Sequence, residues 1–167
     1  MRHRRLRASL AALAMLILVS AGLPAPIDVH AQTPPDIAVI VHPSVTIDNL
    51  SLADLRRILT GDREFWAAGS QRVTIFIRAP IARERDAVVR DVCQMTEAQF
   101  RQHWIGKVFR AETPSGPKIV YSADSTIEQV SRTPGAIGLV LSPVTAKGVK
   151  VLKIDGRTPG QAGYKLR

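Results

Sequence analysis

Short apolar runs alternate with segments of helical periodicity along most of the chain. The runs are rich in β-branched and aliphatic residues, which is typical of buried strands. We expect strands at 37–41, 73–77, 118–121, 136–141 and 149–154. We expect helices, from apolar positions at helical spacing, at 52–60, 82–93, 97–109 and 126–133. This alternation predicts an α/β sheet with helices packed over it.

Hydroxyl side chains mark the predicted starts of three helices. Ser51 directly precedes the first helix, as an N-cap residue would. Thr96 with Gln99 has the spacing of a capping box, in which each side chain bonds the backbone N–H of the other residue. Ser125 with Glu128 repeats that spacing, so helix capping is the structural interpretation of Ser125.

Two of the predicted helices carry apolar stripes that we expect to face the core. The stripe of the 82–93 segment consists of Ile81, Val88, Val89 and Val92. On its other face, Asp86 and Arg90 are four residues apart and can form an ion pair. The stripe of the 97–109 helix consists of Phe100, Trp104 and Val108, with Ile105 and Phe109 beside it. Aromatic residues at this spacing are more typical of a core than of a ligand platform.

The first 31 residues have the composition of a signal peptide. Four arginines lie among the first seven residues, and Ala8 to Leu23 are apolar or small. Val29-His30-Ala31 is similar to a signal-peptidase site, so we expect cleavage near Ala31, a flexible leader at 32–36 and one domain at 37–167. The alternative is an uncleaved anchor, although a spanning helix needs roughly 20 residues. We expect a periplasmic or secreted product without stable membrane insertion.

Basic side chains outnumber acidic ones. The 167 residues include 23 lysines and arginines against 14 aspartates and glutamates, a net charge of +9. Loss of residues 1–31 removes four arginines and one aspartate, so the domain stays basic. The charges are spread singly, which indicates ordinary solvation with a weak attraction to anions. Nucleic acid is not an expected partner of an exported chain without an aromatic-basic repeat.

Few residues could support catalysis or metal binding. His42 and His103 are the only histidines after the predicted cleavage site, and Cys93 is the only cysteine. A zinc site needs three or four clustered ligands, and the spacing of these residues suggests none. Cys93 follows apolar positions, which favours a buried small hydrophobe over a reactive thiol. The sequence therefore predicts no enzyme activity, no metal site and no cofactor.

Arg78 is the strongest candidate for a ligand contact. It ends the apolar run 73–77 and stands shortly before the segment that begins near Ala82. A guanidinium at the junction of strand and helix is suited to an anion, because the helix N-terminus adds unpaired N–H groups and partial positive charge. Ser122 and Ser125 carry hydroxyls that could bind the same anion.

Three segments together resemble the phosphate-binding proteins of ABC transporters. Leu55 to Gly61, with Trp66 and Gly69, is similar to a helix-glycine-tryptophan segment of that family. Residues 73–78 resemble its strand that ends in arginine, and residues 133–140 its proline-glycine-alanine-isoleucine-glycine strand entry. The resemblance covers most of residues 37–155 and only the second of the family's two lobes. It implies a single lobe of the type II periplasmic-binding-protein fold, a mixed, mostly parallel sheet flanked by helices.

One departure from the family pattern concerns the candidate ligand site. In the family the arginine is followed by a glycine-serine-glycine-threonine turn that holds phosphate, whereas residues 79–84 here contain no hydroxyl. Glu84 stands near the helix N-terminus and could pair with Arg78. Arg78 is therefore either a structural ion-pair residue or a ligand contact.

Two functional hypotheses remain. The first is an exported binding protein that holds phosphate or another small anion weakly, in connection with ABC-type transport. A single lobe would enclose only half of a ligand, and tight binding normally requires more complete enclosure. The second hypothesis is a ligand-free interaction protein that docks on an envelope protein or on another copy of itself.

Overall fold

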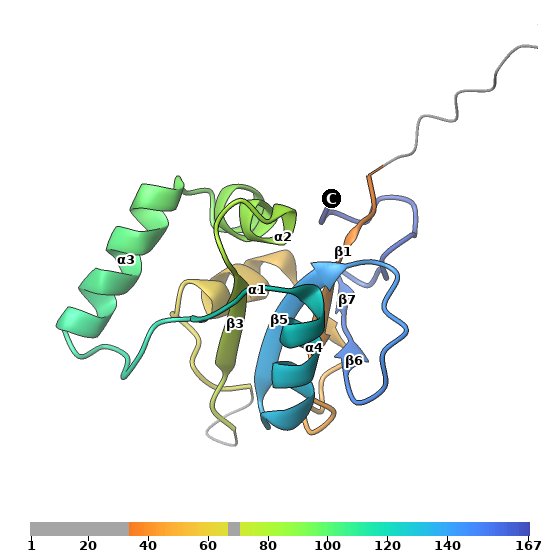
Figure 1. Ribbon diagram of the computed structural model, residues 1–167, viewed down its shortest axis with the longest axis horizontal. Helices are drawn as coiled ribbons and strands as arrows, with labels where there is room; N and C mark the ends of the chain where they lie inside the picture. Colours follow the sequence, from red (N-terminus) through yellow and green to blue (C-terminus); the bar gives the residue numbers. More distant parts are fainter. Residues whose placement is uncertain (1–33, 67–70) are drawn as a thin grey trace, which may run out of the picture. The chain divides into compact units, whose positions relative to one another are not determined.

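The computed structural model describes residues 34–66 and 71–167. The strands are β1 (Ile37–Val41), β2 (Asn49–Leu50), β3 (Thr74–Arg78), β4 (Lys118–Val120), β5 (Ala136–Leu141), β6 (Lys150–Val151) and β7 (Lys153–Ile154). The helices are α1 (Leu52–Leu59), α2 (Arg83–Asp86), the π-helix η1 (Ala87–Val92), α3 (Glu97–Phe109) and α4 (Ala123–Arg132) (Figure 1). The predicted signal peptide, the first leader residues and Gly69 lie outside the described residues.

The larger sheet has five strands in the order β4-β3-β5-β1-β6. β3 runs parallel to both β4 and β5, whereas β1 is antiparallel to both β5 and β6. The sheet is mixed, as predicted, but its pairings are evenly divided rather than mostly parallel. β1 lies between β5 and β6 and runs opposite to both of them, so β5 and β6 point in the same direction.

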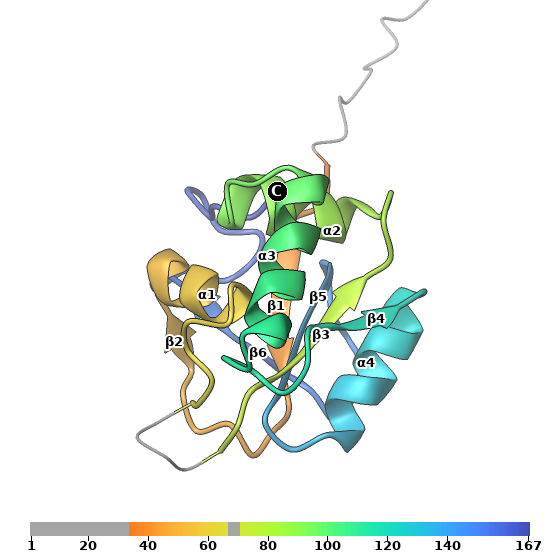
Figure 2. The same cartoon turned by 90° about the vertical axis from the view of Figure 1, so that its left-hand side faces the viewer.

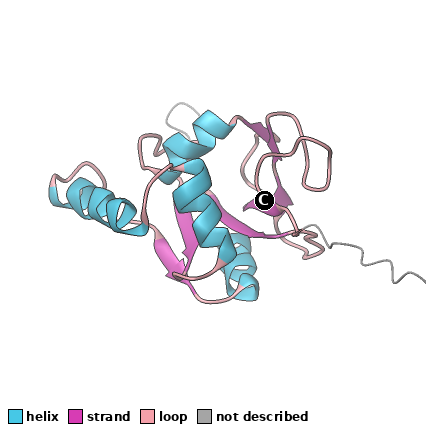
Figure 3. Ribbon diagram, turned by 90° about the horizontal axis from the view of Figure 1, so that it is seen from above, coloured by secondary structure: helices cyan, strands magenta, loops and turns pink. Residues whose placement is uncertain are grey.

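Strand β1 lies in the centre of the core and is buried along its whole length. Ile37, Val39 and Val41 pack on the side of α1 and η1, while Ala38 and Ile40 pack on the side of α4. The helices therefore cover both faces of the sheet (Figures 2 and 3). This arrangement confirms the predicted α/β class.

Helix α4 sits unusually close to β5 because of a glycine. A Cβ atom at Gly138 would lie 2.7 Å from the Thr126 Cγ2 atom and 3.0 Å from the Val130 Cγ2 atom. Only glycine permits this approach of helix and strand. Just before β5, Gly135 has a φ of +77°, and its carbonyl accepts a hydrogen bond of 2.8 Å from the Trp66 indole.

Two predicted helix starts are confirmed and one is wrong. The Ser51 side chain caps α1, and Thr96 and Gln99 form a capping box at α3. Helix α4 begins three residues earlier than predicted, with Ser122 as its N-cap. The Ser122 hydroxyl accepts a hydrogen bond of 3.0 Å from the Ser125 N–H, so Ser125 lies inside the first turn and does not cap the helix.

The strand predicted at 149–154 is divided between two sheets. Residues 150–151 pair with β1, and residues 153–154 pair with β2 in a separate parallel ribbon. Leu152 between them is fully buried. The hydrophobic pattern of residues 149–154 fits one continuous strand, so it could not show that the two halves pair with different strands.

The apolar stripe predicted for residues 82–93 is buried except for its first member, Ile81. Ile81 was expected in the core but is 97% exposed and has a φ of +79°, because the turn after Pro80 points it away from the helix. Val88, Val89 and Val92 are buried as predicted. Arg90 pairs with Asp91 at 2.8 Å rather than with Asp86, which follows from the altered side-chain spacing of a π-helix.

The predicted core stripe of α3 holds only in its first half. Phe100 and Trp104 are buried, whereas Val108, Ile105 and Phe109 are exposed, Phe109 by 90%. α3 contacts η1, but no described element covers its outer face, and it lies to one side of the other helices (Figures 1 and 3). Lys107 in the second half of α3 is buried, although it is charged. Its Nζ atom donates a hydrogen bond of 2.8 Å to the Asp62 carboxylate, which compensates the buried charge.

The two ends of the domain meet at the start of β1. The Ile37 N–H donates to the Leu166 carbonyl at 2.9 Å, and the buried Tyr164 hydroxyl donates to the Ile37 carbonyl at 2.8 Å. The Asp36 carboxylate accepts a bond from the Gly160 N–H at 2.6 Å. The last residues are therefore part of the support of the first strand.

Candidate functional site

The candidate site lies where two parallel strands end. Arg78 is the last residue of β3, and its partner in the sheet is Val120, the last residue of β4. A short turn joins β3 to α2, and Tyr121 and Ser122 join β4 to α4. The carboxyl ends of parallel strands form the edge at which α/β proteins commonly hold ligands.

The side chain of Arg78 is largely enclosed and faces Glu84. The two side chains are 16% and 6% exposed, and the Arg78 Nε atom lies 3.7 Å from the Glu84 Oε1 atom. This is the ion pair that the sequence suggested. The separation is too long for a hydrogen bond. The two side chains therefore attract each other only through their charges, and the Arg78 N–H groups donate no hydrogen bond to Glu84.

Two nitrogen atoms of Arg78 are buried without a hydrogen-bond partner among the described residues. These atoms are Nε and Nη1. Buried donors are almost always bonded in native proteins, and leaving a charged donor unmet is costly. The guanidinium therefore retains donor capacity for an acceptor that this part of the chain does not supply.

Arg85 fixes the backbone of Arg78. Its Nη1 atom donates to the Arg78 carbonyl at 3.2 Å, while Nε and Nη2 bind both oxygens of Glu97 at 3.1 and 2.5 Å. The Arg85 guanidinium also lies 5.5 Å from the centre of the Phe100 ring. Sequence reasoning missed this residue, because nothing in the pattern links a residue of α2 to α3 and to the end of β3.

The two candidate serines lie on the first turn of α4 and at the same sheet edge as Arg78. The Ser122 oxygen is occupied as a capping acceptor, but its hydroxyl proton remains able to donate to an anion. Ser125 contributes its backbone N–H to the cap and has a half-buried side chain. The sheet register places the three residues at one edge, but no direct contact links Arg78 to either serine.

The other chemically active side chains have local structural partners. The His103 Nε2 atom lies 2.8 Å from the Thr60 carbonyl oxygen, and the His42 Nδ1 atom lies 2.7 Å from the Ser44 hydroxyl. Burial raises the pKa of the Cys93 thiol from 9.0 to about 12, which keeps it protonated at neutral pH. In the described part of the chain, no three His, Cys, Asp or Glu residues are grouped so as to hold a metal ion.

Two large exposed side chains follow the two strands that end at the site. Ile81 follows the end of β3, and Tyr121 follows the end of β4. Both are strongly exposed, Tyr121 by 82%.

Separately, no helix within residues 34–66 and 71–167 has the length and hydrophobicity that a membrane crossing requires.

The chain shares its fold with phosphate-binding proteins of known structure. PstS from Borrelia burgdorferi matches with a TM-score of 0.63 and 18% identity over 79% of this chain and 54% of that one. An ABC-type phosphate transport receptor from Vibrio cholerae matches with a TM-score of 0.59 and 16% identity over 75% of this chain and 48% of that one.

A third match contains its ligand. This is a Clostridium perfringens protein assigned as a phosphate ABC transporter substrate-binding protein, solved with bound phosphate. Its TM-score is 0.58 and its identity 19%, over 73% of this chain and 46% of that one. No protein-family model matches the sequence, and no curated protein matches it.

The matches confirm the fold expected from the sequence. The chain spans about half the length of these structures, which fits one lobe of a two-lobed binding protein. At identities below 20% the likeness concerns the fold and not the ligand.

Proposed function

We propose that this chain is an exported, single-lobe binding protein that holds phosphate or a similar small anion weakly at Arg78. The observation that carries the proposal is the pair of buried Arg78 nitrogen atoms, Nε and Nη1, for which residues 34–66 and 71–167 offer no hydrogen-bond partner. A phosphate oxygen is a strong acceptor for a guanidinium and can accept two of its N–H groups at once. The hydroxyls of Ser122 and Ser125 are the proposed secondary contacts.

Two features keep the proposed affinity low. The Glu84 carboxylate, 3.7 Å from Arg78, neutralises part of its charge and repels an anion. The site also forms the edge of a single lobe, so a bound anion would remain largely hydrated on its other side. Small ligands bind tightly when most of their surface is enclosed. We therefore expect millimolar rather than micromolar dissociation constants.

The fold matches support the class of function that we propose. One matched protein is named as a phosphate transport receptor, and another is named as a phosphate transporter substrate-binding protein and holds phosphate. A basic net charge also favours an anionic ligand over a cationic one. Export rests on the basic and apolar pattern of residues 1–31. We place the protein in the periplasm, in connection with ABC-type transport.

A phosphate titration of the Arg78→Gln variant tests the proposal. Heat of binding or amide resonances near residues 77–85 would report the wild-type response, which we expect to disappear in the variant. Arg132→Gln is the matched control, because Arg132 is an exposed α4 arginine paired with Glu128 at 3.0 Å. An equal response of the wild type and Arg78→Gln to phosphate would overturn the proposal.

A second candidate function is an interaction protein without a ligand. It is favoured by the exposure of Ile81 and Tyr121 beside the site, since exposed apolar clusters commonly mark docking surfaces. Under this hypothesis the partner is an envelope protein or a second copy of the chain. Crosslinking in intact cells distinguishes the two candidates. A crosslinked partner that is lost in an Ile81→Ser, Tyr121→Ser variant, with no phosphate response in the wild type, would favour the second one.

A further inference from the structure

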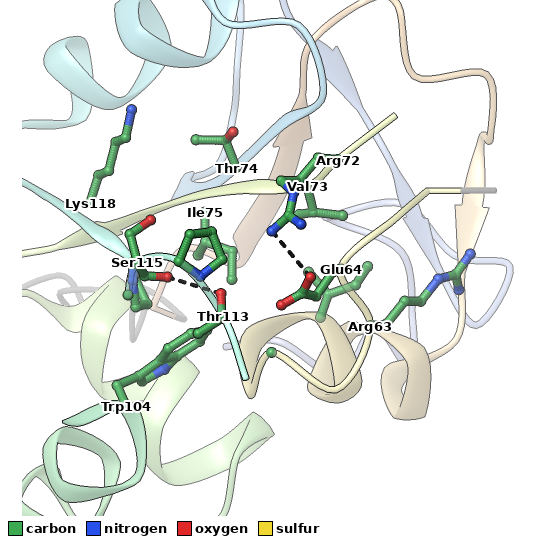
Figure 4. Close-up of a pocket in the computed structure, with 15 residues that line it drawn as sticks. Arg63, Glu64, Arg72, Val73, Thr74, Ile75, Trp104, Thr113, Ser115 and Lys118 are labelled. Carbon is green, nitrogen blue, oxygen red and sulfur yellow. Dashed lines mark hydrogen bonds and ion pairs between the residues drawn. The ribbon is translucent and has the colours of Figure 1, made fainter. Parts of the chain in front are cut away.

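A cavity separate from the Arg78 site lies near the opposite end of β3. Its volume is about 190 Å³, and an apolar cavity of about 150 Å³ already holds a benzene-sized molecule. Its walls come from the segment after α1, the first residues of β3, the loop 113–117 and α3 (Figure 4). Arg78 and the two candidate serines are not part of its lining.

Two polar atoms at this cavity are buried and lack a hydrogen-bond partner among the described residues. They are the Trp104 Nε1 atom and the Glu64 Oε1 atom. The Trp104 side chain, a donor, comes from α3 and is only 7% exposed. The Glu64 carboxylate, an acceptor, enters from the segment after α1 (Figure 4). The protein's other tryptophan, Trp66, has its indole N–H bonded to the Gly135 carbonyl at 2.8 Å.

Two of the three cationic side chains around the cavity are paired with carboxylates. The Glu64 Oε2 atom pairs with Arg72 at 3.1 Å, and Arg63 pairs with Asp54 at 3.4 Å. The Lys118 ammonium lies 5.6 Å from the centre of the Phe76 ring and points away from the other labelled side chains (Figure 4). Because the charges of Glu64 and of both arginines are already paired and the Lys118 ammonium is directed away, the interior of the cavity favours an uncharged ligand.

The remaining walls combine apolar and hydroxyl side chains. The apolar ones are Ile58, Val73, Ile75, Pro114, Pro117 and the Trp104 ring, and the hydroxyl ones are Thr74, Thr113 and Ser115, with Gly61 and Gly116 completing the lining. A ligand that fits such a site has an apolar face for these walls and an edge with both acceptor and donor groups for Trp104 and Glu64. Small polyols and monosaccharides have this combination, because their C–H groups form one face and their hydroxyls both donate and accept.

We propose that this cavity binds a small uncharged polyol, of monosaccharide size or smaller. One ligand oxygen accepts the Trp104 indole N–H, and one ligand hydroxyl donates to Glu64 Oε1. The inference is independent of anion binding at Arg78, because the two sites share no residue.

The two tryptophans provide the measurement. In a spectrum of the isotope-labelled full-length protein, the two indole N–H resonances are resolved and assigned by Trp66→Phe. Glycerol, glucose and myo-inositol are titrated separately, with inorganic phosphate as a charged probe. We expect at least one polyol to shift the Trp104 indole in a saturable way, while the Trp66 indole stays in place.

Variants separate ligand contacts from structural effects. Trp104→Phe and Glu64→Met should each weaken the polyol affinity read from the amides of Thr113, Ser115 and Gly116 about tenfold, the order expected for one lost hydrogen bond to a buried group. Arg78→Gln should leave this response unchanged. A Trp104 indole that does not respond to any polyol, or responds only to phosphate, overturns the proposal. An unchanged polyol response in Glu64→Met does the same, since it means that the ligand makes no bond to this carboxylate.

Discussion

The Arg78 Nε atom and the Glu84 Oε1 atom lie 3.7 Å apart at the end of β3. This separation keeps the charges attracted without satisfying the hydrogen-bonding capacity of the arginine. The pair thus combines the two interpretations that the sequence left open. Arg78 has an internal counter-charge, and it also retains donors for an external acceptor.

Replacing Glu84 by glutamine should strengthen phosphate binding. The Glu84 carboxylate and phosphate are both negative and repel each other. Removing this repulsion at a partly screened site should make the binding free energy more favourable by about 1 kcal/mol, or roughly fivefold in affinity. Calorimetric titration with phosphate measures the change. Glu128→Gln, which neutralises a half-exposed carboxylate on α4, is the control and should leave the affinity as it is. Weaker binding in Glu84→Gln would show that the carboxylate does not compete with the anion.

Loss of the Arg85 side chain should destabilise the domain. Arg85 is buried, bonds both oxygens of Glu97 and also bonds the Arg78 carbonyl. Arg85→Gln should lower the free energy of unfolding by about 2–3 kcal/mol, because several hydrogen bonds of a buried charged group are lost. Urea unfolding followed by circular dichroism gives the value.

The neighbouring Arg90 provides the comparison for this experiment. Its side chain is 73% exposed and pairs with Asp91, and Arg90→Gln should leave the stability essentially unchanged. Equal stability losses in the two variants would mean that the contacts of Arg85 are not structural.

Substitution of the two α4 serines should have unequal effects on stability. Ser122→Ala removes the acceptor of the Ser125 N–H and should cost about 1 kcal/mol, the usual effect of losing an N-cap. Ser125→Ala keeps that bond and should change stability by less than about 0.5 kcal/mol. Thermal unfolding of both variants shows whether Ser122, as in the structure, or Ser125, as predicted from the sequence, caps α4. A larger loss in Ser125→Ala would favour the latter.

The Cys93 thiol should be unreactive in the folded protein. Its burial raises its pKa from 9.0 to about 12, so the thiolate that reacts with aromatic disulfide reagents is scarce at pH 8. Cys93 is the only cysteine of the chain, and the reagent therefore reports on one group. We expect reaction only after addition of denaturant. Rapid modification of the native protein at pH 8 would contradict the burial.

The same shift has a consequence for stability. Because the pKa of Cys93 is higher in the folded state, its contribution to stability is complete below pH 9 and declines as the pH rises from 9 toward about 12. Burial also raises the pKa of Tyr164, which adds to the decline. Cys93→Ala should make the loss of unfolding free energy over this range smaller, and urea unfolding at several pH values measures it.

The sequence indicated the parts of this fold that depend on local chemistry. The strands at 37–41 and 136–141 agree with β1 and β5, and the caps at Ser51 and Thr96 are present. These features follow from backbone preferences and side-chain bonds within a few residues. The pairing of Arg78 with Glu84 is equally local, since the two residues flank one turn.

The errors arose where tertiary packing decides the outcome. The apolar character of Val108 and Phe109 predicts burial, but no described element reaches the outer face of α3. Ile81 has the right spacing for a buried stripe, yet the turn after Pro80 turns it outward. The Trp104 and Glu64 cavity had no sequence signal, because its walls come from segments that meet only in the folded chain.

The position of β1 bears on the order in which the protein can fold. It is the first strand of the domain to be synthesised, yet its partners β5 and β6 and the tail residues Tyr164 and Leu166 are among the last. Strand β1 therefore has no strand partner in the larger sheet until β5 has been synthesised. Such distant pairings make folding slow, and the core around β1 can close only once residues 136–166 are present.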